Sequence, residues 1–286
     1  MVLFHIKRTD TDQFLFETKT TESNDTLIRT LVKINNMRVL IQQLCLGCER
    51  LVEFGPMKRP EEQGLDEVKE KAGEAIEKGP HYKADPLGQR TGNACAPELA
   101  EIVKRTCEEA KACIHKDQVA RRVALSVEML QERIDNIHGA VKIAYPMGLP
   151  EWDVVRQMLE DKADFDGTSA GQEMLDADTA QLWWAGKEFF RDQTVGDRAG
   201  RNEKTRLMAR LQRRGGGPPV REPAVSEEER KSMMAHYFKK QEEAKRMAED
   251  EEDDFLYSAW ANPKGLKSAL VGTSSGIAFR PGGRKS

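Results

Sequence analysis

Cys45 and Cys48 form the first pair of residues in the chain whose spacing suggests chemistry. A CxxC pair can hold a metal ion through its thiolates or cycle between a dithiol and a disulfide. A structural zinc site usually takes four ligands, however, and no second pair has this spacing. A redox pair normally opens a helix after a strand, whereas this pair lies inside a helical pattern. The spacing therefore favours buried or half-buried thiols over a metal or redox site.

The other candidate nucleophiles, bases and phosphate-binding loops are scattered. Cys95, Cys107 and Cys113 make the cysteine count odd, which without a secretion signal favours reduced thiols in the cytoplasm. Residues 215–217 are glycines followed by two prolines, so they predict a hinge and not a nucleotide cradle. No Ser/His/Asp or Cys/His grouping follows from the spacing of the histidines, which are His5, His81, His115, His138 and His236. We predict no enzyme, no metal, no cofactor and no small-molecule substrate.

A basic stretch runs over residues 191–222, with nine Lys/Arg against four acids. Lys204, Arg210 and Arg213 lie within it and are candidate partner-binding residues. An RNA-binding module using this stretch is the alternative function, but the stretch lacks the interleaved aromatics on which bases stack. A solvated helix face or a docking surface for an acidic protein partner is therefore favoured, and nucleic acid is the less favoured ligand.

Aromatic residues supply the remaining candidate contacts. Trp183 and Trp184 are predicted on a helix, where neighbours point about 100° apart, so one can enter the core while the other meets another element or protein. The alternative, that both pack within the chain, is favoured. Phe255, Tyr257 and Trp260 follow six consecutive acids, a pattern typical of a linear motif that fills a partner's pocket. A solvated tail whose aromatics fold back is the equally weighted alternative.

Composition limits the classes of protein that remain. The 286 residues are 33% charged and 6% aromatic with a net charge of −3, which is polar for a single globule and predicts exposed helix or tail. With this small negative net charge, the protein as a whole has no electrostatic attraction for nucleic acid or for an anionic membrane. No run approaches the roughly 20 apolar residues of a membrane span, and the N-terminus is too quickly interrupted by charge for a signal peptide.

The N-terminal elements follow from hydrophobic periodicity. Residues 2–8 and 13–18 predict a hairpin. A helix follows from Thr26, with a kink or end at Asn35–Asn36, and it resumes to Gly55. Beyond it we expect a long loop over residues 56–96, with a short helix near 66–76. Then come a helix from Pro97, a short strand at 123–125, a helix ending at Gly139 and a strand at 140–145.

The C-terminal elements are predicted to be mostly helical, with helices over 172–191 and 202–213 and a third from Ser226. The fold class is therefore α+β, with a small, β-grasp-like N-terminal mixed sheet and helices, then a mostly helical extended half and a disordered tail. The expected domains are an α+β domain at 1–150, a helical basic segment with a Gly-Pro hinge at 151–225, a charged amphipathic helix at 226–254 and a tail at 255–286.

Several segments carry a resemblance to a known family. The most specific are YPMGLP, at the end of residues 139–150, and QLWWA within 180–188. Others are the start MVLFHIKR, EEAKA at 108–112, GTSAG at 167–171, NEKT at 202–205 and REP at 221–223. On these segments the chain resembles the Kurly family of cilia- and flagella-associated proteins from Met1 to about Pro281.

The resemblance implies a non-enzymatic scaffold or adaptor of motile cilia with no catalytic residues to carry over. Family members are associated with cytoplasmic assembly of outer dynein arms and hence with ciliary motility. They are also linked to basal bodies and to the position of the cilium in the epithelium. The implied partners are axonemal dynein assembly factors, a MYND-type zinc-finger protein and dynein chains. The implied locations are cytoplasm, cytoskeleton and basal body, with the axoneme as a further possibility.

Overall fold

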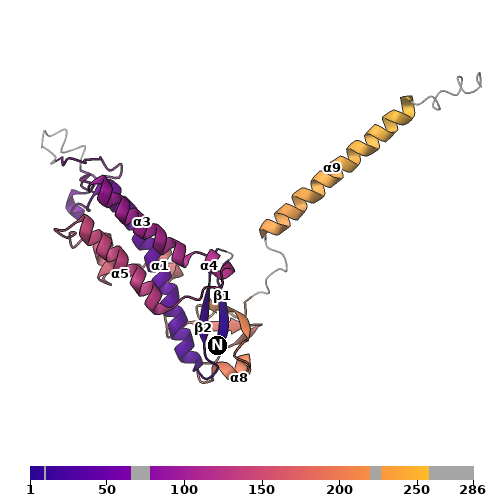
Figure 1. Ribbon diagram of the computed structural model, residues 1–286, viewed down its shortest axis with the longest axis horizontal. Coiled ribbons are helices and arrows are strands. Elements are labelled where there is room, and N and C mark those ends of the chain that lie inside the picture. Colours follow the sequence, from indigo (N-terminus) through magenta and orange to yellow (C-terminus); the bar gives the residue numbers. More distant parts are fainter. Residues whose placement is uncertain (10, 66–77, 220–226, 258–286) are drawn as a thin grey trace, which may run out of the picture. The chain divides into compact units, whose positions relative to one another are not determined.

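The computed structural model describes residues 1–9, 11–65, 78–219 and 227–257 (Figure 1). The chain divides into two units, Met1–Val220 and Arg221–Ser286. The first unit combines a mixed sheet with helices, so the predicted α+β class is confirmed. Strands from both sides of residue 150 belong to this one unit, whereas the sequence predicted a domain boundary there.

The sheet joins the beginning of the first unit to its end. The hairpin of β1 (Val2–Lys7) and β2 (Gln13–Thr18) is antiparallel, as predicted. β5 (Arg206–Gln212) runs parallel to β1, and β3 (Gln181–Trp184) pairs antiparallel with both β5 and β4 (Lys187–Glu188). Within the described residues the order is β2-β1-β5-β3-β4. A parallel central pair and a long helix after the first hairpin agree with the predicted β-grasp-like sheet.

Strand alternation gives the sheet one buried face. Val2, Phe4 and Ile6 of β1 are fully buried, and Leu207 and Leu211 of β5 alternate with more exposed residues in the same way. Successive side chains on a strand point to opposite faces, so these residues share the core side. Arg206 and Arg210 therefore lie together on the opposite face of β5.

The long helix α1 (Asn24–Phe54) begins where Ser23 caps it, because the Ser23 side chain accepts a hydrogen bond from the Thr26 N–H at 3.1 Å. The predicted kink or end at Asn35–Asn36 is wrong. Asparagine weakens a helix when its side chain competes for local backbone groups. Here Asn36 instead exchanges two hydrogen bonds with the backbone of Leu175, at 2.8 and 2.9 Å, so the helix continues.

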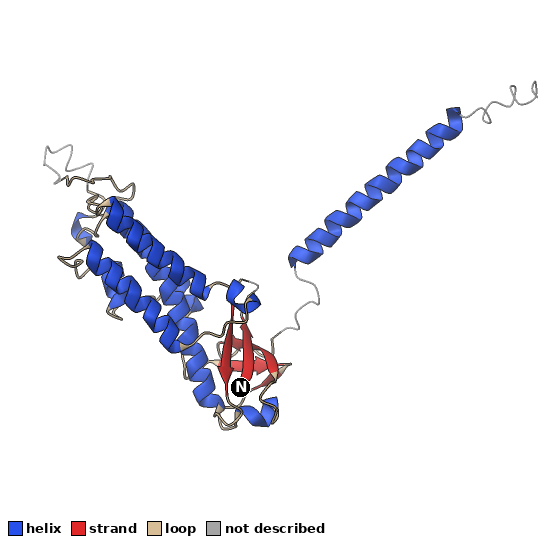
Figure 2. Ribbon diagram, in the orientation of Figure 1, coloured by secondary structure: helices blue, strands red, loops and turns tan. Residues whose placement is uncertain are grey.

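Three long helices lie side by side, as Figure 2 shows in blue: α1, α3 (Pro97–Ile114) and α5 (Val127–Ala144). The predicted helix end at Gly139 and strand at 140–145 are wrong, because α5 runs through both. Ala140, Val141 and Ala144 are buried, a spacing that fits one face of a helix, whereas Ile143, which a strand would place beside Val141, is exposed. Packing against α3 offsets the roughly 1 kcal/mol that a glycine costs inside a helix.

The connection between α3 and α5 is short. It contains α4 (Asp117–Ala120) and, where the sequence predicted a strand at 123–125, a single bridge between Ala124 and Leu15. The short helices α6 (Val154–Leu159), α7 (Ser169–Glu173) and α8 (Val195–Ala199) follow.

The predicted helix over 172–191 is wrong, because β3, a tight turn and β4 occupy residues 181–188. The turn residues Ala185 and Gly186 have φ of 49° and 76°. Two successive residues with positive φ make the two-residue turn whose twist suits a hairpin. Asparagine or aspartate normally marks the first of these positions, so the Ala-Gly pair gave no hairpin signal.

The predicted helix over 202–213 is also wrong, because this segment holds β5. The sequence RLMARLQ is made of good helix formers, and intrinsic propensity therefore favours a helix. Tertiary context decides otherwise, since Leu207, Ala209 and Leu211 are all buried in the alternation of a strand between β1 and β3.

The long loop after α1 is anchored where the structure describes it, at 56–65 and 78–96; the predicted short helix near 66–76 lies outside the described residues. η1 (Pro60–Glu62) is its one described helical turn. Asp153 is fully buried and accepts hydrogen bonds from the Met57 N–H and the Val155 N–H, both at 2.9 Å. The Arg90 guanidinium lies 3.6 Å from the same carboxylate and donates to the Gly55 carbonyl. The loop is thus held by buried polar contacts.

The described part of the second unit is α9 (Glu227–Tyr257). The predicted cap Ser226 lies outside the described residues. Because α9 extends to Tyr257, the predicted charged helix over 226–254 continues through residues 255–257, which the sequence assigned to the tail. The large apolar side chains described along α9 are exposed, which agrees with the predicted charged helix: Met233, Met234, Tyr237, Phe238 and Met247. Among the helices described, none combines the length and apolar character needed to cross a membrane.

Candidate functional site

The cysteine pair is part of the core. Cys45, Cys48 and Cys107 are buried free thiols, and Cys95 and Cys113 are half-buried, so the predicted thiols are confirmed. Gly47, between the two cysteines, allows α6 to pack closely against α1, because a Cβ at this position would lie 2.9 Å from the Val155 side chain of α6. Among the residues described, no three His, Cys, Asp or Glu side chains are grouped so that they could hold a metal ion.

A large cleft lies where β1 and β5 end, beside the middle of α1. We name it the Arg210 cleft; its volume is about 900 Å³. The turn between β1 and β2, the end of α3, and the end of α7 with Leu175 after it complete its walls. Six Lys/Arg side chains and two carboxylates line it: Arg8, Arg38, Lys111, Lys116, Arg210 and Arg213, with Asp12 and Glu173.

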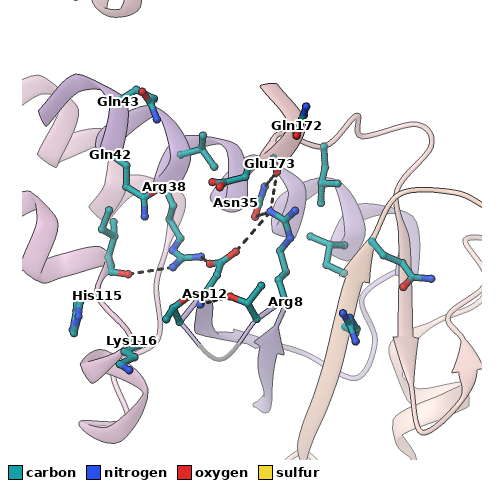
Figure 3. Close-up of a pocket in the computed structure, with 18 of the residues that line it drawn as sticks. Arg8, Asp12, Asn35, Arg38, Gln42, Gln43, His115, Lys116, Gln172 and Glu173 are labelled. Carbon is teal, nitrogen blue, oxygen red and sulfur yellow. Dashed lines mark hydrogen bonds and ion pairs between the residues drawn. The ribbon is translucent and has the colours of Figure 1, made fainter. Parts of the chain in front are cut away.

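A network around Asp12 fixes the centre of the cleft (Figure 3). The buried Arg38 guanidinium donates to the Asp12 carboxylate at 2.5 Å and to the Ile114 carbonyl at 3.2 Å, and it stacks 4.9 Å from the Phe14 ring centroid. Arg8 donates to the Asn35 side-chain oxygen at 2.9 Å and to the Glu173 carbonyl at 2.8 Å. Arg8 also lies 3.7 Å from the Asp12 carboxylate, so both arginines have a carboxylate partner within the fold.

Other cations of the cleft are not neutralised in this way. The side chains of Arg210 and Lys116 are half-buried and make no ion pair or hydrogen bond to another described residue. Arg213 donates from one nitrogen to the Gly171 and Met174 carbonyls, which are neutral acceptors. Lys111 pairs with Glu49 outside the lining, and His115 lies 3.1 Å from the Asp117 carboxylate. The cleft thus keeps uncompensated positive charge on Arg210, Lys116 and Arg213.

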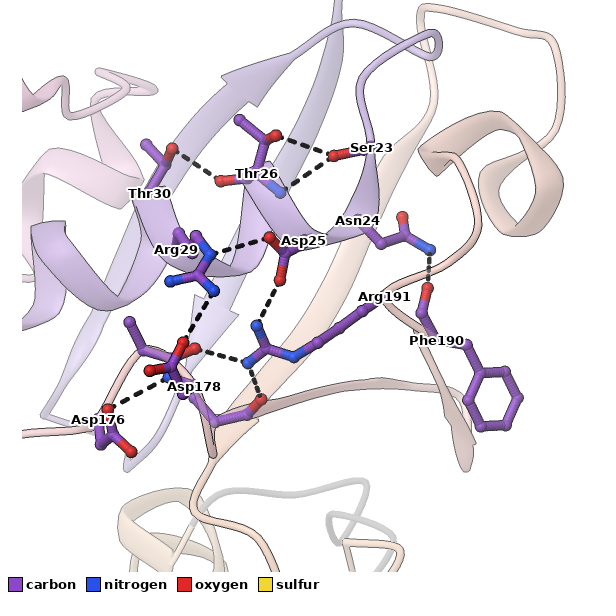
Figure 4. A network of polar contacts seen from close by, with 12 residues as sticks. Ser23, Asn24, Asp25, Thr26, Arg29, Thr30, Asp176, Asp178, Phe190 and Arg191 are labelled. Carbon is purple, nitrogen blue, oxygen red and sulfur yellow. Dashed lines mark hydrogen bonds and ion pairs between the residues drawn. The ribbon is translucent and has the colours of Figure 1, made fainter.

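Part of the predicted basic stretch is structural, as Figure 4 shows for Arg191. Its guanidinium donates to Asp25 at 2.5 Å and to the carbonyls of Ala177 and Ala180. Arg29, and then Arg191, hold the pKa of the Asp25 carboxyl below its usual value. These contacts tie the start of α1 to the segments on either side of β3 and β4, so Arg191 is not available to a partner.

The tryptophan pair lies on β3, so the two side chains point to opposite faces of the sheet. Trp184 packs against the core, with its ring centroid 6.5 Å from that of Phe189. Trp183 is half-buried on the other face, directly opposite Arg210 in the strand register. Its indole N–H is buried and has no hydrogen-bond partner among the described residues. A partner contact by Trp183 stays a prediction.

The structure does not bring the remaining predicted contact residues together. Lys204 is exposed in the turn before β5 and does not line the cleft. Phe255 and Tyr257 lie in the last turn of α9, in the second unit. Trp260 lies outside the described residues. Arg210 and Arg213 are thus the two predicted residues that share a site.

Sequence reasoning missed most of the Arg210 cleft, because its other cations come from the first 120 residues. One signal was present. Arg38 falls between Ile34 and Ile41 on the apolar side of α1, and a charged residue on a buried helix face needs a partner. The turn residue Asp12 is that partner, but nothing local to either residue predicts the pairing.

Comparison with known proteins gives the family. The family model described as cilia- and flagella-associated protein 298 matches residues 180–275. The protein of that name from Homo sapiens is 40% identical over 224 residues, which cover 75% of this chain and 77% of the relative. Cilia- and flagella-associated protein 298-A of Xenopus laevis is 39% identical, and the Drosophila melanogaster relative is 33% identical, over the same shares. The search of solved structures found no match. The chain belongs to the cilia- and flagella-associated protein 298 family.

Proposed function

We propose that this chain is a non-enzymatic adaptor of motile cilia that supports the cytoplasmic assembly of outer axonemal dynein arms. Membership of a family of cilia- and flagella-associated proteins carries the proposal. The proposed consequence of its loss is impaired ciliary motility and cilium positioning. The proposed partners are axonemal dynein assembly factors, a MYND-type zinc-finger protein and dynein chains.

The described surface supports recognition of proteins. The first unit holds a cleft whose central arginines are fixed by neighbours and whose outer cations are uncompensated. The described part of the second unit is a long helix with exposed methionines and aromatics, side chains that are enriched where proteins meet. An adaptor needs such separate surfaces, and the proposed locations are cytoplasm, the cytoskeleton at the basal body, and the axoneme.

Depletion and rescue test the proposal. The chain is removed from cells that grow motile cilia and is restored as the wild type. Axonemes from depleted cells are expected to lack outer dynein arms in electron micrographs and to beat weakly, and the wild type is expected to restore both. Crosslinking mass spectrometry of cytoplasm and isolated axonemes is expected to recover dynein chains or their assembly factors. Normal outer arms after complete depletion would contradict the proposal.

A further inference from the structure

Within the proposed adaptor function, on which this step rests, we infer that the Arg210 cleft binds a short acidic peptide segment of a partner protein. The segment presents carboxylates to Arg210, Lys116 and Arg213 and places an aliphatic side chain beside Leu46. The net charge of the whole chain is −3, so this cleft is a local positive site on a protein without overall attraction for anions.

The outer cations are placed to receive charge from outside the fold. Arg210 projects from β5 and Lys116 from the segment after α3, on different walls of the cleft. Neither contacts another described residue through an ion pair, and Arg213 meets only neutral carbonyls. A half-buried cation gains more from an opposite charge than an exposed one does, because it is less screened by water and salt.

The centre of the cleft is already organised. Asp12 holds Arg38, and Asn35 and the Glu173 carbonyl hold Arg8, so these side chains are fixed before any ligand arrives. A ligand therefore does not have to order this part of its site, which lowers the entropic cost of binding.

The lining matches a peptide better than a nucleic acid. Gln42 and Gln43 of α1 line the cleft, and their side chains make no hydrogen bond to other described residues (Figure 3). An amide side chain both donates and accepts, as a peptide backbone does. Leu46 lies on the same wall and is 52% exposed, which gives an aliphatic side chain a place to pack. No Phe, Tyr or Trp ring lines the cleft on which a base could stack.

Fluorescence anisotropy on the full chain tests the inference with a labelled EEELEEE peptide as the probe. Binding is expected to weaken steeply as salt rises from 50 to 500 mM. Arg210→Glu and Lys116→Glu are each expected to weaken it by about tenfold, because each reverses a charge that faces the peptide. Arg206→Glu is the matched control, since it makes the same charge change on the exposed part of the same strand; it is expected to change affinity less than about twofold.

Three further probes decide what the site recognises. A QQQLQQQ peptide is expected not to bind, EEEGEEE to bind more weakly than EEELEEE, and single-stranded oligouridine to bind more weakly than either acidic peptide. Oligouridine that binds more tightly than EEELEEE and loses affinity in Arg210→Glu would overturn the inference in favour of a nucleic-acid site. Equal loss of binding in Arg210→Glu and Arg206→Glu would also overturn it.

Folding and function are separated by two readouts. Each variant is compared with the wild type by its thermal unfolding midpoint; should Arg210→Glu unfold, Lys116→Glu carries the test, because the Lys116 side chain has no described partner to lose. Failure of the peptide to bind, while depletion still removes outer dynein arms, contradicts this inference alone. Normal arms after depletion, together with Arg210-dependent peptide binding, contradict the proposed function alone.

Discussion

Arginines in this protein serve two different purposes, and the nearest acceptor decides which. Arg38 is 4% exposed and has a carboxylate, a carbonyl and an aromatic ring around it, so its charge stabilises the fold. Arg210 is half-buried, and its side chain has no ion-pair or hydrogen-bond partner among the described residues. The same side chain is therefore structural in one wall of the cleft and available for recognition in another.

At the residue scale, Asp12→Ala is expected to lower the free energy of unfolding by about 2 kcal/mol. The change leaves Arg38 buried without its carboxylate, and breaking a buried pair from one side is costly. The figure is discounted because Asp12 itself is 32% exposed. Urea denaturation followed by circular dichroism measures the effect.

A double-mutant cycle and a surface pair are the controls for Asp12. Arg38→Met combined with Asp12→Ala is expected to be more stable than Asp12→Ala alone, because no buried charge is then left unpaired. Glu109→Ala breaks the pair with Arg105. The Arg105 side chain is 75% exposed and that of Glu109 is 59% exposed, so the change is expected to cost less than about 0.5 kcal/mol. An Asp12→Ala effect as small as that of Glu109→Ala would show that Arg38 does not need its partner.

At the element scale, the contact between α1 and α3 depends on neutral thiols. Contact with Cys107, and then burial, raises the pKa of Cys45. For Cys107, the contact with Cys45 lowers the pKa, but the contact with Cys48 and burial together raise it to about 12. Both thiols therefore stay protonated in the native protein at neutral pH, which makes them packing groups with low reactivity.

These pKa shifts predict a loss of stability in alkali. In the unfolded chain the two thiols ionise near pH 9.0, their unperturbed value, whereas the native protein keeps both protons. The stabilisation is complete below pH 9 and is lost as the pH rises above it, because only the unfolded state releases protons there. Each thiol contributes a slope of about 1.4 kcal/mol per pH unit. Urea unfolding between pH 7 and 10.5 measures the slope.

The Cys45→Ala/Cys107→Ala variant is the control for the alkaline slope. Its absolute stability is expected to be lower, but the extra decline above pH 9 should be reduced, and the difference in slope isolates the thiols. Burial also raises the pKa of Tyr145, so its contribution to stability falls with rising pH in the same way. Tyr145 is present in both proteins, so its contribution cancels in the comparison. Identical slopes in the two proteins would mean that the thiols ionise alike in the native and unfolded states.

Local patterns predicted the elements whose signal is contained in their own residues. The hairpin of β1 and β2 and the helix α3 follow from periodicity alone. The fate of residues 206–212 does not, because good helix formers become a strand only when β1 and β3 lie on either side. The cleft has the same difficulty: Arg210 and Arg213 were expected from charge, whereas Asp12, Arg38 and Lys116 join them only through the fold.

At the scale of the whole molecule, the sheet of the first unit closes late in the sequence. β5 lies between β1 and β3, so removing it separates the hairpin from the rest of the sheet. A chain that ends at Thr205 is expected to lose cooperative unfolding, because β1 then has an unpaired edge and the core loses the buried side chains of β5. A chain that ends at Val220 keeps every element of the first unit and is expected to unfold cooperatively.

Thermal melts of these two truncated chains, followed by near-ultraviolet circular dichroism, measure the difference. The pair differs by only 15 residues, which makes the longer chain the control for the shorter one. A cooperative melt of the chain ending at Thr205, at a similar midpoint, would contradict the view that β5 completes the core.

The parallel pairing of Leu3 with Arg206 has a consequence during synthesis. The first hairpin leaves the ribosome on the order of tens of seconds before its neighbouring strand is translated. Until β5 is translated, the edge of β1 lacks its partner strand, and unpaired edges of this kind can pair with the wrong chain. The order of the strands in the sequence therefore predicts that the nascent chain is most prone to aggregation before β5 has been made.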